Sequence, residues 1–599
     1  MRTRVGFGRT SCLAALALAC SCAAPQIEAG PKPQAAPAQA SDAAPKRTLV
    51  VVGINDTHGA LLPAPPQRWL AKTTTSEVGG ADWFAGYLNV IRAQTKAAGG
   101  DVVVLDGGDL FQGTLISNQF QGRSVVDAYN ALGVTAAAVG NHEFDFGMAV
   151  LKDRMAQARF PLLSANIFLK GTDQRPDWAR PYVIVEAAGT KVGIIGFSTV
   201  ETPLTTNPIN ISDLDFREAG PIAAALADEL RRQGCTVVLI TCHMGPKGDG
   251  EVQRLAGAVK GKVDGIVSGH HHEAIGPPPL VAFGIPIVQA GSKLTNFSVI
   301  ELSLDAKGAA THFEVNRGTT PRPGGPQPIL HFEGGAKAQW RGTTIEPDEK
   351  VAAILRDYDV QVKQLRDSQI GATTVTLHKG GRDDLLANLC ADSLRSGAGG
   401  GLKADFSFQN SGGLRVPEIA SGPITFGQIF DLYPFDNQQI VLRLQAAQVR
   451  DALETVLRAG KGPLRVSGLR YTVDWERFGA GKGVLKSLPP GAIVTEVLDL
   501  TSNKPLCVTK SCTASACATE CASGTFTLSV TDFLANGGDG LTLLKDAPRE
   551  IGAVLARDMI VAYVKDHSPL TAAQLGAVSA GQPARITTVG HSKTSQASE

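Results

Sequence analysis

The 599-residue chain has no charge excess, no internal repeat and, after its first residues, no long apolar segment. Lys and Arg number 57 against 56 Asp and Glu, a formal net charge of +1, whereas proteins that coat nucleic acid usually carry a basic excess. No stretch beyond residue 22 reaches the roughly 20 apolar residues that a membrane-spanning helix needs. With 43% hydrophobic and 19% charged residues, the composition indicates a globular protein, and the length predicts more than one domain.

The first residues have the pattern of an export signal. Three arginines precede an apolar run that ends at Cys20 and is too short to span a bilayer. We interpret residues 1–22 as a signal peptide of lipoprotein type, with lipid attachment at Cys20 or Cys22, and residues 23–46 as a Pro/Ala-rich tether. Simple secretion with an untypical cleavage site is the alternative. In both cases we expect the folded part outside the cytoplasm, in the periplasm or at the cell surface.

Cysteine usage agrees with export. Four of the cysteines lie in one short loop rich in Ser, Thr and Ala: Cys507, Cys512, Cys517 and Cys521. They allow three disulfide pairings, which the sequence cannot distinguish. A zinc site is the alternative, but the loop lacks paired C-x2-C units, so disulfides in an oxidising compartment are favoured. Three other cysteines are predicted to be buried, unreactive thiols: Cys235, Cys242 and Cys390.

Short Val- and Ile-rich runs alternate with helical candidates in the first half of the chain. This alternation is typical of α/β layering, and we expect a buried sheet that is covered by helices on both faces. The helical candidates there are Trp83–Ala98, Val125–Ala131, Ala149–Gln157 and Pro221–Gln233. A Pro/Gly cluster at 321–326 breaks the pattern, and apolar spacing then predicts an amphipathic helix from Pro347 to Arg366. The predicted parts are an α/β domain at 47–320, a linker with a connecting helix at 321–370, a second α/β domain at 371–590 and a frayed tail at 591–599.

Five of the apolar runs end in residue types that bind metal ions. The endings are Asp56-Thr57-His58, Asp106-Gly107-Gly108-Asp109, Gly140-Asn141-His142-Glu143, Thr241-Cys242-His243 and Gly269-His270-His271-His272. In open α/β sheets ligands gather in the loops past the carboxyl ends of the strands, so we expect these side chains to meet. Asp, His and Asn suit borderline or hard divalent ions. Asp109 follows two glycines and is the natural carboxylate to bridge two cations.

Structural roles are the alternative for each of these residues taken alone. A single strand-end His is usually structural, and Asn141 could cap a helix that begins just after it. All five endings, in order and each after an apolar run, favour a two-metal site. His271 lacks the ligand spacing and is expected to lie outside the ligand set, Glu143 is expected to hold its loop, and Cys242 should face the core because neighbours on a strand point to opposite faces. Five histidines show no such pattern and are predicted to be structural: His312, His331, His378, His567 and His591.

Two sets of motifs carry a family resemblance. The order Asp56-x-His58, Gly-Asp109, Gly-Asn141-His142-Glu143, His243 and Gly-His270-x-His272 resembles the signature of calcineurin-like metallophosphoesterases. More narrowly, Asn55-Asp56-Thr57-His58-Gly59 and Gly140-Asn141-His142-Glu143-Phe144-Asp145 resemble the secreted 5′-nucleotidase and UDP-sugar hydrolase family. The resemblance implies that one metal ion is held by Asp56, His58, Asp109 and His272, and the other by Asp109, Asn141, His243 and His270. It also implies that His142 faces the phosphate without binding metal, and that Asp145 orients and charges His142.

Three later stretches resemble the nucleotide-binding domain of the same family. They are Phe408–Arg415, Asp431–Asn437 and Asp532–Gly540. The implied substrate-binding residues are Phe435 and Phe533 for the base, Asp539 for the ribose, Asn410 and Arg415 for base or phosphate-proximal groups and, on a looser local match, Arg382. Stacking on aromatic side chains is worth roughly 1–3 kcal/mol per base. The alternative is that Phe435 and Phe533 are core aromatics and that Asp539 forms a turn.

The resemblance implies an α/β fold with a metallophosphoesterase domain of layered sheets flanked by helices and a C-terminal α/β 5′-nucleotidase domain. The implied activity is an extracytoplasmic phosphohydrolase that uses two divalent ions, such as Zn, Mn or Co, and a metal-activated water to release phosphate from nucleotides. UDP-sugar hydrolase or 2′,3′-cyclic phosphodiesterase activity can accompany it. The expected partner is a small nucleotide rather than a nucleic-acid polymer. Two alternatives remain: a non-catalytic nucleotide- or metal-binding surface lipoprotein, and the same chemistry on a sulfur-containing substrate.

Overall fold

The computed structural model describes residues 47–66, 77–247, 250–319, 321–381, 384–480 and 482–590. All of them belong to one unit of the fold, which begins at Pro45. The predicted signal peptide, tether and C-terminal tail, and also Arg382 and His591, lie outside the described residues. Among the described helices, none is both long enough and apolar enough to cross a bilayer.

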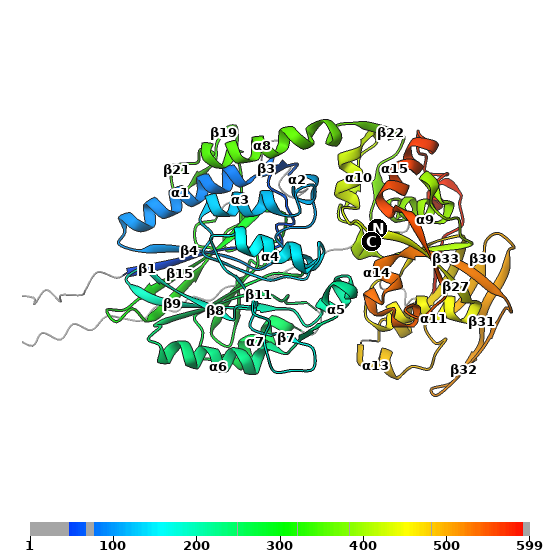
Figure 1. Cartoon of the computed structure of the whole chain (residues 1–599), viewed down its shortest axis with the longest axis horizontal. Coiled ribbons are helices and arrows are strands. Elements are labelled where there is room, and N and C mark those ends of the chain that lie inside the picture. The colour runs from blue at the N-terminus through cyan, green and yellow to red at the C-terminus, as the bar shows by residue number, and fades with distance from the viewer. Residues whose placement is uncertain are drawn as a thin grey trace, which may run out of the picture. The chain divides into compact units, whose positions relative to one another are not determined.

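Two mixed sheets form the first part of the fold (Figure 1). In the first sheet the strand order is β16 (Ala310–Val315), β15 (Asn296–Leu304), β1 (Arg47–Ile54), β4 (Asp101–Asp106), β5 (Ala136–Ala138) and β6 (Leu162–Leu163), with β17 (Gln327–Pro328) beside β15. In the second the order is β13 (Leu280–Ala282), β14 (Ile285–Val288), β12 (Gly265–Ser268), β11 (Val237–His243), β9 (Thr190–Ser198) and β8 (Tyr182–Ala187). Strands β1, β4, β5 and β6 are parallel, and so are β9, β11, β12 and β14. Each sheet therefore has a block of parallel strands whose carboxyl ends share an edge.

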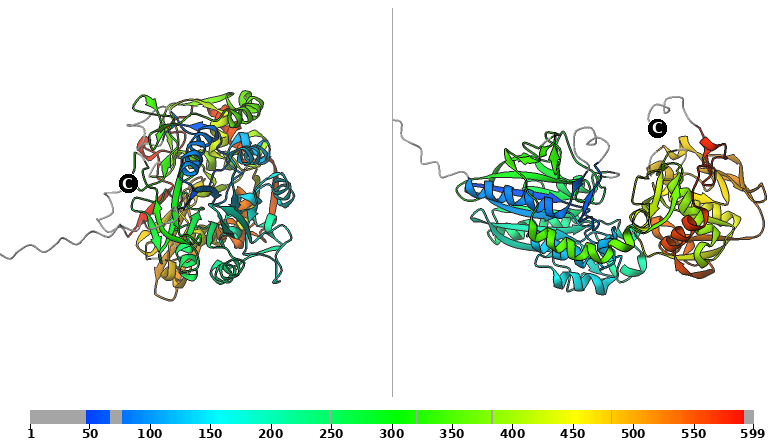
Figure 2. Two further views of the ribbon diagram at one scale, coloured as in Figure 1. Left: turned by 90° about the vertical axis from the view of Figure 1, so that its left-hand side faces the viewer. Right: turned by 90° about the horizontal axis from the view of Figure 1, so that it is seen from above.

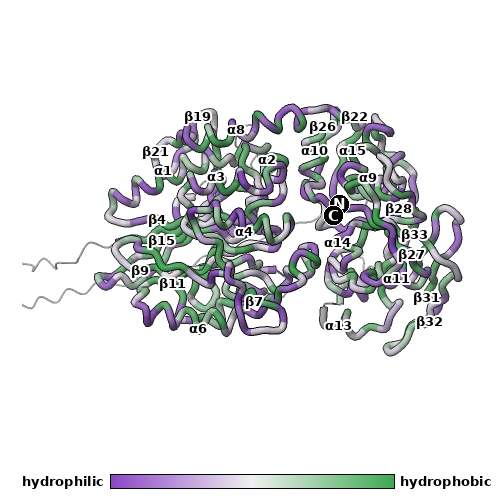
Figure 3. Tube along the Cα trace, in the orientation of Figure 1, coloured by the Kyte–Doolittle hydropathy of each residue, from purple (hydrophilic) through white to green (hydrophobic). Residues whose placement is uncertain are grey.

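The two sheets pack face to face. Val51 and Leu105 of the first sheet and Ile194 and Leu239 of the second lie in one buried cluster. Each fully buried side chain of this kind contributes about 1.5–3 kcal/mol. Strands β9, β11 and β15 accordingly show as hydrophobic in Figure 3.

Among the described residues, helices cover the outer face of each sheet. The helices beside the first sheet are α1 (Ala81–Ala97), α3 (Arg123–Leu132) and α4 (Met148–Gln157), and those beside the second are α6 (Ala219–Arg232) and α7 (Glu251–Ala258). The expectation of one sheet with helices on both faces was wrong, whereas the layered sheets flanked by helices that the family resemblance implied are confirmed. A strand that is apolar on both faces has the same sequence pattern whether a helix or a second sheet covers it. All four helices predicted here begin and end within two residues of their observed bounds.

Helix α8 (Glu349–Arg366) confirms the predicted connecting helix and joins the two parts of the fold. The Asp348 side chain caps the helix by accepting hydrogen bonds from the backbone N–H groups of Lys350 and Val351, as an N-cap residue should. Val351 near its start packs into the first core, whereas Val362 near its end packs with Phe430. Figure 2 shows α8 in green beside the helices of the first part.

The second part contains two five-stranded sheets. One has the order β28 (Arg465–Ser467), β24 (Phe406–Gln409), β33 (Thr525–Thr531), β27 (Gln438–Gln445) and β34 (Arg549–Leu555). The other has the order β32 (Cys517–Cys521), β31 (Lys504–Cys512), β30 (Val494–Asp499), β29 (Leu469–Asp474) and β35 (Ile586–Val589). The main helices are α9 (Leu385–Ser396), α10 (Phe426–Leu432), α11 (Ala446–Arg458) and α15 (Ala556–His567). The second α/β domain is thus built of sheets and helices, as the sequence predicted.

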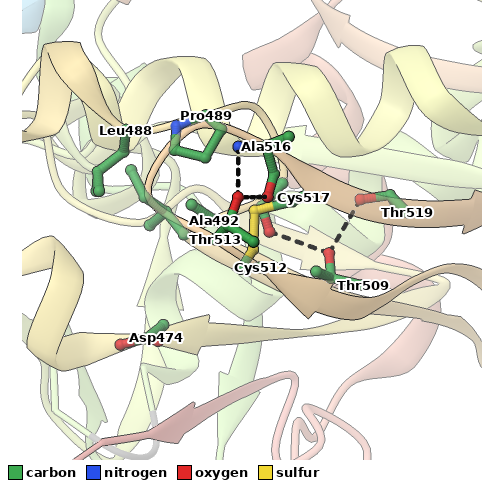
Figure 4. The surroundings of a disulfide bond; sticks show 12 residues. Asp474, Leu488, Pro489, Ala492, Thr509, Cys512, Thr513, Ala516, Cys517 and Thr519 are labelled. Carbon is green, nitrogen blue, oxygen red and sulfur yellow. Dashed lines mark hydrogen bonds between the residues drawn. A yellow bond between two sulfur atoms is a disulfide. The ribbon is translucent and has the colours of Figure 1, made fainter.

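The β31–β32 hairpin selects one of the three possible disulfide pairings. Cys507 faces Cys521 and Cys512 faces Cys517 across the antiparallel register, and each facing pair is bonded. Thr509 hydrogen-bonds Thr519 between the two bridges, as Figure 4 shows beside Cys512–Cys517. The prediction of disulfides is confirmed, and the zinc alternative is wrong. The cysteines predicted to be inert are free and buried: Cys235, Cys242 and Cys390.

Candidate active site

The structure brings the predicted metal ligands together at the carboxyl ends of the parallel strands. Atoms of Asp56, His58 and His272 that can bind a metal lie within 4.8 Å of one another, and so do those of Asp56, Asp109 and His243. The two groups share Asp56, which follows β1. Apart from the exposed His272, these side chains are almost fully buried. Four of the five endings therefore meet at one place, as expected for loops past the carboxyl ends of parallel strands.

Backbone contacts aim two of the imidazoles at the centre of this cluster. Nδ1 of His58 lies 2.8 Å from the carbonyl oxygen of Gln112, and Nδ1 of His243 lies 2.8 Å from that of Gly107. When Nδ1–H donates to a carbonyl, the lone pair of Nε2 is free to bind a metal. Nε2 of His58 faces Nε2 of His272 at 3.0 Å, and Nε2 of His243 lies 3.1 Å from Oδ2 of Asp109. Imidazole nitrogens and carboxylates that face each other at these distances fit a divalent cation between them.

The cluster also carries concentrated backbone strain. Five of its members have φ in the left-handed region: Asp56 (50°), His58 (49°), Asp109 (59°), His270 (78°) and His272 (54°). Such a conformation costs a non-glycine residue of order 1–3 kcal/mol and persists only where the surroundings enforce it. Here the enforcing contacts include Asp56 N–H to Gly108 O at 2.9 Å and His58 N–H to Asp109 O at 3.0 Å.

Electrostatics favour a bound cation. Burial acts to raise the pKa of the Asp109 carboxyl, but His243, His142 and His58 hold it well below its usual range. The same balance, with His272 as the main partner, lowers the pKa of Asp56. The side-chain amide of Gln112, which lines the adjoining cavity and is almost fully buried, bonds to no residue that the structure describes. A buried polar atom of this kind calls for a polar occupant of the cavity. The clustered carboxylates and imidazoles are donor types that bind divalent cations, so these residues fit a metal.

Glu143 holds the loop that carries Asp109. Its carboxylate accepts N–H bonds from Asp109 at 2.9 Å, Leu110 at 2.6 Å and Gly140 at 2.7 Å. The predicted loop-holding role is confirmed. The alternative that Asn141 caps a helix is wrong, because its side chain makes no capping bond and its Oδ1 instead lies 3.1 Å from Nε2 of His243.

His142 and Asp145 form a pair beside the cluster. Nδ1 of His142 lies 2.6 Å from Oδ2 of Asp145, whose other oxygen accepts a 2.9 Å bond from the Thr206 hydroxyl. Burial lowers the pKa of His142, but the carboxylates of Asp145 and Asp109 outweigh burial and raise it. The imidazole is 5.3 Å from the ring of His58 and 5.7 Å from that of Phe435. It therefore lies between the metal-ligand cluster and an aromatic of the second part.

One cavity of about 600 Å³ is lined by both sets of predicted residues. Its lining includes Asp109, Asn141, His142, Asp145, His270 and His272 from the first part, and Asn410, Arg415, Phe435, Phe533 and Asp539 from the second. The side-chain amide of Asn410 donates to Asp539 at 2.8 Å, and Arg415 approaches Nε2 of His58 at 2.8 Å. Both phenylalanines are only half-buried and line this cavity, which separates them from ordinary core aromatics.

Comparison with known proteins decides the family. The calcineurin-like phosphoesterase family model matches residues 49–274, and the model of the 5′-nucleotidase C-terminal domain matches residues 364–546. The chain belongs to the 5′-nucleotidase/UshA family. It is a two-domain α/β metallophosphoesterase hydrolase of 5′-nucleotidase type.

Several family members match along most of their length. Snake venom 5′-nucleotidase of Gloydius brevicauda is 29% identical over 562 residues, which cover 86% of each chain. Protein UshA of Yersinia enterocolitica is 27% identical and covers 81% of this chain and 86% of its own. The crystal structure of a 5′-nucleotidase precursor from Thermus thermophilus superposes with a TM-score of 0.71 at 26% identity, over 91% of this chain and all of that one.

Sequence reasoning missed several residues of this 5′-nucleotidase-type site. Glu201 lies just past β9, with Oε2 3.5 Å from Nε2 of His270 and 3.7 Å from Nζ of Lys461. The sequence could have indicated Glu201, because ligands gather past the carboxyl ends of parallel strands and Glu201 follows β9, which is parallel to β11. Lys461 and Gln112 belong to no motif that the sequence analysis used. His271 lies apart from the ligand set, as predicted, and its Nδ1 accepts the Lys247 N–H at 3.0 Å.

Proposed function

We propose that this chain is an exported phosphohydrolase that releases phosphate from nucleotides, with 5′-nucleotidase activity first and UDP-sugar or 2′,3′-cyclic nucleotide hydrolysis as further activities. The single cavity that joins the metal-ligand cluster to two aromatic rings and Asp539 carries the proposal. A nucleotide has the same three chemical parts, a phosphate, a ribose and a flat base. The names of the relatives, 5′-nucleotidases of venom and of Thermus thermophilus, support the substrate class.

Two divalent ions are part of the proposal. Asp56, His58, Asp109 and His272 would hold one, and Asp109, Asn141, His243 and His270 the other, with Asp109 shared. When bound, such ions supply positive charge for the phosphate and lower the pKa of a water. Zn, Mn and Co are all compatible with this ligand set.

His142 stabilises negative charge on the phosphate. Asp145 accepts from its Nδ1 and raises its pKa, so the imidazole keeps a proton available on Nε2. Donors fixed in advance near developing charge commonly contribute a factor of 10²–10³ in rate. Thr206 holds the second oxygen of Asp145, so the pair stays aligned.

The second part of the chain recognises the nucleoside. Phe435 and Phe533 stack the base, Asp539 accepts from the ribose hydroxyls, and Asn410 supports Asp539 through their 2.8 Å bond. Arg415 provides a planar guanidinium that suits phosphate oxygens. We assign the catalytic domain to residues 47–320 and the nucleotide-binding domain to residues 371–590. Two disulfides support export, and lipid attachment at Cys20 or Cys22 completes the proposal.

Phosphate release from AMP by the purified protein tests this function. Asp109→Ala and His142→Ala should each lower the rate by at least a hundredfold, whereas His312→Ala, which changes an exposed histidine outside the site, should leave it unchanged. Unchanged release by the first two variants would refute the proposal. Parallel assays with UDP-glucose, 2′,3′-cyclic AMP and a sulfur-containing ester define the substrate range. AMP that binds the metal-loaded protein but is never cleaved would support the non-catalytic alternative.

A further inference from the structure

The loop after β14 is fastened to the first metal-ligand loop. The Asn55 side chain donates to Gly291 O at 2.6 Å and accepts from Ala290 N–H at 2.6 Å. The Lys293 backbone N–H donates to the carbonyl oxygen of Asp56 at 2.7 Å. Three bonds therefore tie residues 290–293 to the segment that carries Asp56, and the two segments must move together.

Lys293 is held in a strained conformation within this loop. Both Lys293 and Leu294 have positive φ, 57° and 47°, although neither is a residue type that favours the left-handed region. The side chain of Leu294 is buried in the first core, which fixes the turn. Two consecutive residues in this conformation are strained, and such strain often clusters at functional positions.

The side chain of Lys293 leaves this turn and reaches the predicted substrate-binding loop. Its Nζ donates to the carbonyl oxygen of Arg415 at 2.9 Å. A second lysine, Lys379, donates from Nζ to the carbonyl oxygen of Leu414, the residue before Arg415, at 2.7 Å. Unlike Lys293, Lys379 belongs to the same part of the chain as Arg415. The guanidinium of Arg415 approaches Nε2 of His58 at 2.8 Å. Lys293 thus connects the main chain at Asp56 with the main chain of the arginine that approaches the metal-ligand cluster.

We propose that Lys293 is a positioning residue, which fixes Arg415 relative to the metal ligands so that its guanidinium meets the substrate phosphate. The inference rests on the proposed function, because it concerns the same site. The bond that Nζ makes is to the backbone carbonyl oxygen of Arg415, so its effect on the substrate passes through Arg415. The competing explanation, a lysine that merely stabilises the fold, predicts a loss of stability without a coupled loss of substrate affinity.

A double-mutant cycle between Lys293 and Arg415 separates the two explanations. Lys293→Met should raise KM for AMP about tenfold and change kcat less than twofold, because binding of the ground state and of the transition state weaken together. In an Arg415→Met background, Lys293→Met should change KM less than twofold. Lys293→Arg, which can still donate to the carbonyl, should restore KM to within about threefold of wild type. Lys379→Met is the matched control. It removes the lysine–carbonyl bond at Leu414 but keeps the link from Arg415 through Lys293 to Asp56, so it should change KM less than threefold.

Two measurements need no turnover. Calorimetry of AMP binding to the EDTA-treated protein should show about tenfold weaker binding for Lys293→Met. The backbone N–H of Arg415 donates to Leu432 O at 2.9 Å. In Lys293→Met, hydrogen exchange of the peptide that contains Leu414 and Arg415 should be at least threefold faster than in wild type. Three outcomes would each overturn the proposal. They are additive effects of the Lys293 and Arg415 substitutions on KM, equal effects of Lys293→Met and Lys379→Met on KM, and unchanged AMP binding and amide exchange in Lys293→Met. Absence of phosphate release by the wild-type protein would instead refute the proposed function and leave the exchange measurement to decide on Lys293.

Discussion

Replacing Glu251 with glutamine should stabilise the protein at alkaline pH. Glu251 is the first residue of α7 and is almost fully buried. Its carboxylate accepts a 2.8 Å bond from the Thr199 hydroxyl and a 3.1 Å bond from the Val200 N–H. Glutamine can keep both contacts, because its oxygen accepts from the N–H and its NH₂ donates to the hydroxyl oxygen.

The magnitude follows from the pKa. Burial is the main cause that raises the pKa of Glu251 from 4.5 to about 7, and Glu201 adds to it. Because the folded protein binds this proton more tightly than the unfolded chain, the folded state loses stability as pH rises from 4.5 to about 7. The loss is about 1.36 kcal/mol for each pH unit, or about 3 kcal/mol in total above pH 7. A carboxylate at a helix start regains about 0.3–1 kcal/mol from the helix dipole. The expected gain for Glu251→Gln is therefore about 2 kcal/mol at pH 8, and near zero below pH 4.5, where both states are protonated.

Urea unfolding at pH 4.5 and pH 8, in EDTA so that metal binding does not contribute, measures this difference. The variant should unfold at higher urea than wild type at pH 8 and at the same urea at pH 4.5, with an unchanged slope. Glu218→Gln, which changes an exposed glutamate, is the control and should shift neither midpoint. A Glu251→Gln protein that is less stable than wild type at pH 8, or equally shifted at both pH values, would refute the reasoning.

Two further predictions concern the site. Phe435→Ala and Phe533→Ala should each raise KM for AMP by about tenfold, as loss of roughly 1–3 kcal/mol of stacking requires, and steady-state kinetics that show unchanged KM would contradict this. Chelation should abolish phosphate release, and added Mn²⁺, Zn²⁺ or Co²⁺ should restore it; activity that persists in the metal-free protein, verified by elemental analysis, would count against the site.

The strand ends were predictable as ligand positions, because ligands in α/β folds gather past the carboxyl ends of parallel strands. Asp56 and Asp109 follow buried parallel strands of the first sheet, whereas His243 ends a parallel strand of the second. The meeting of the two sheet edges depends on how the sheets pack. The apolar pattern alone did not predict the two-sheet packing, which only the family resemblance implied, because Val51 and Leu239 would be buried equally well beneath helices. The disulfide pairing also lay beyond the sequence, since it depends on the register that places Cys507 opposite Cys521.

Lys293 shows a different limit. Its sequence surroundings, Gly-Ser-Lys-Leu-Thr, indicate only a turn. The contact that matters is made to a backbone carbonyl 122 residues away, and a carbonyl has no residue identity that a motif could record. Interactions with the main chain are therefore systematically harder to predict than clusters of side chains.

Strained backbone is the feature that separates ligand positions from ordinary turns in this site. Gly59 and Gly108 also have positive φ, at 65° and 92°, and an added Cβ at either would collide with Ser117 or with His243. At those positions only the shape of the backbone matters, and glycine supplies it without strain. Asp56 and Asp109 adopt the same kind of conformation but must also present a carboxylate, so glycine cannot replace them. At Asp56 and Asp109 the strain is therefore retained together with the carboxylate that the cluster needs, whereas at Lys293 the strained turn accompanies the bond from Nζ to the carbonyl oxygen of Arg415.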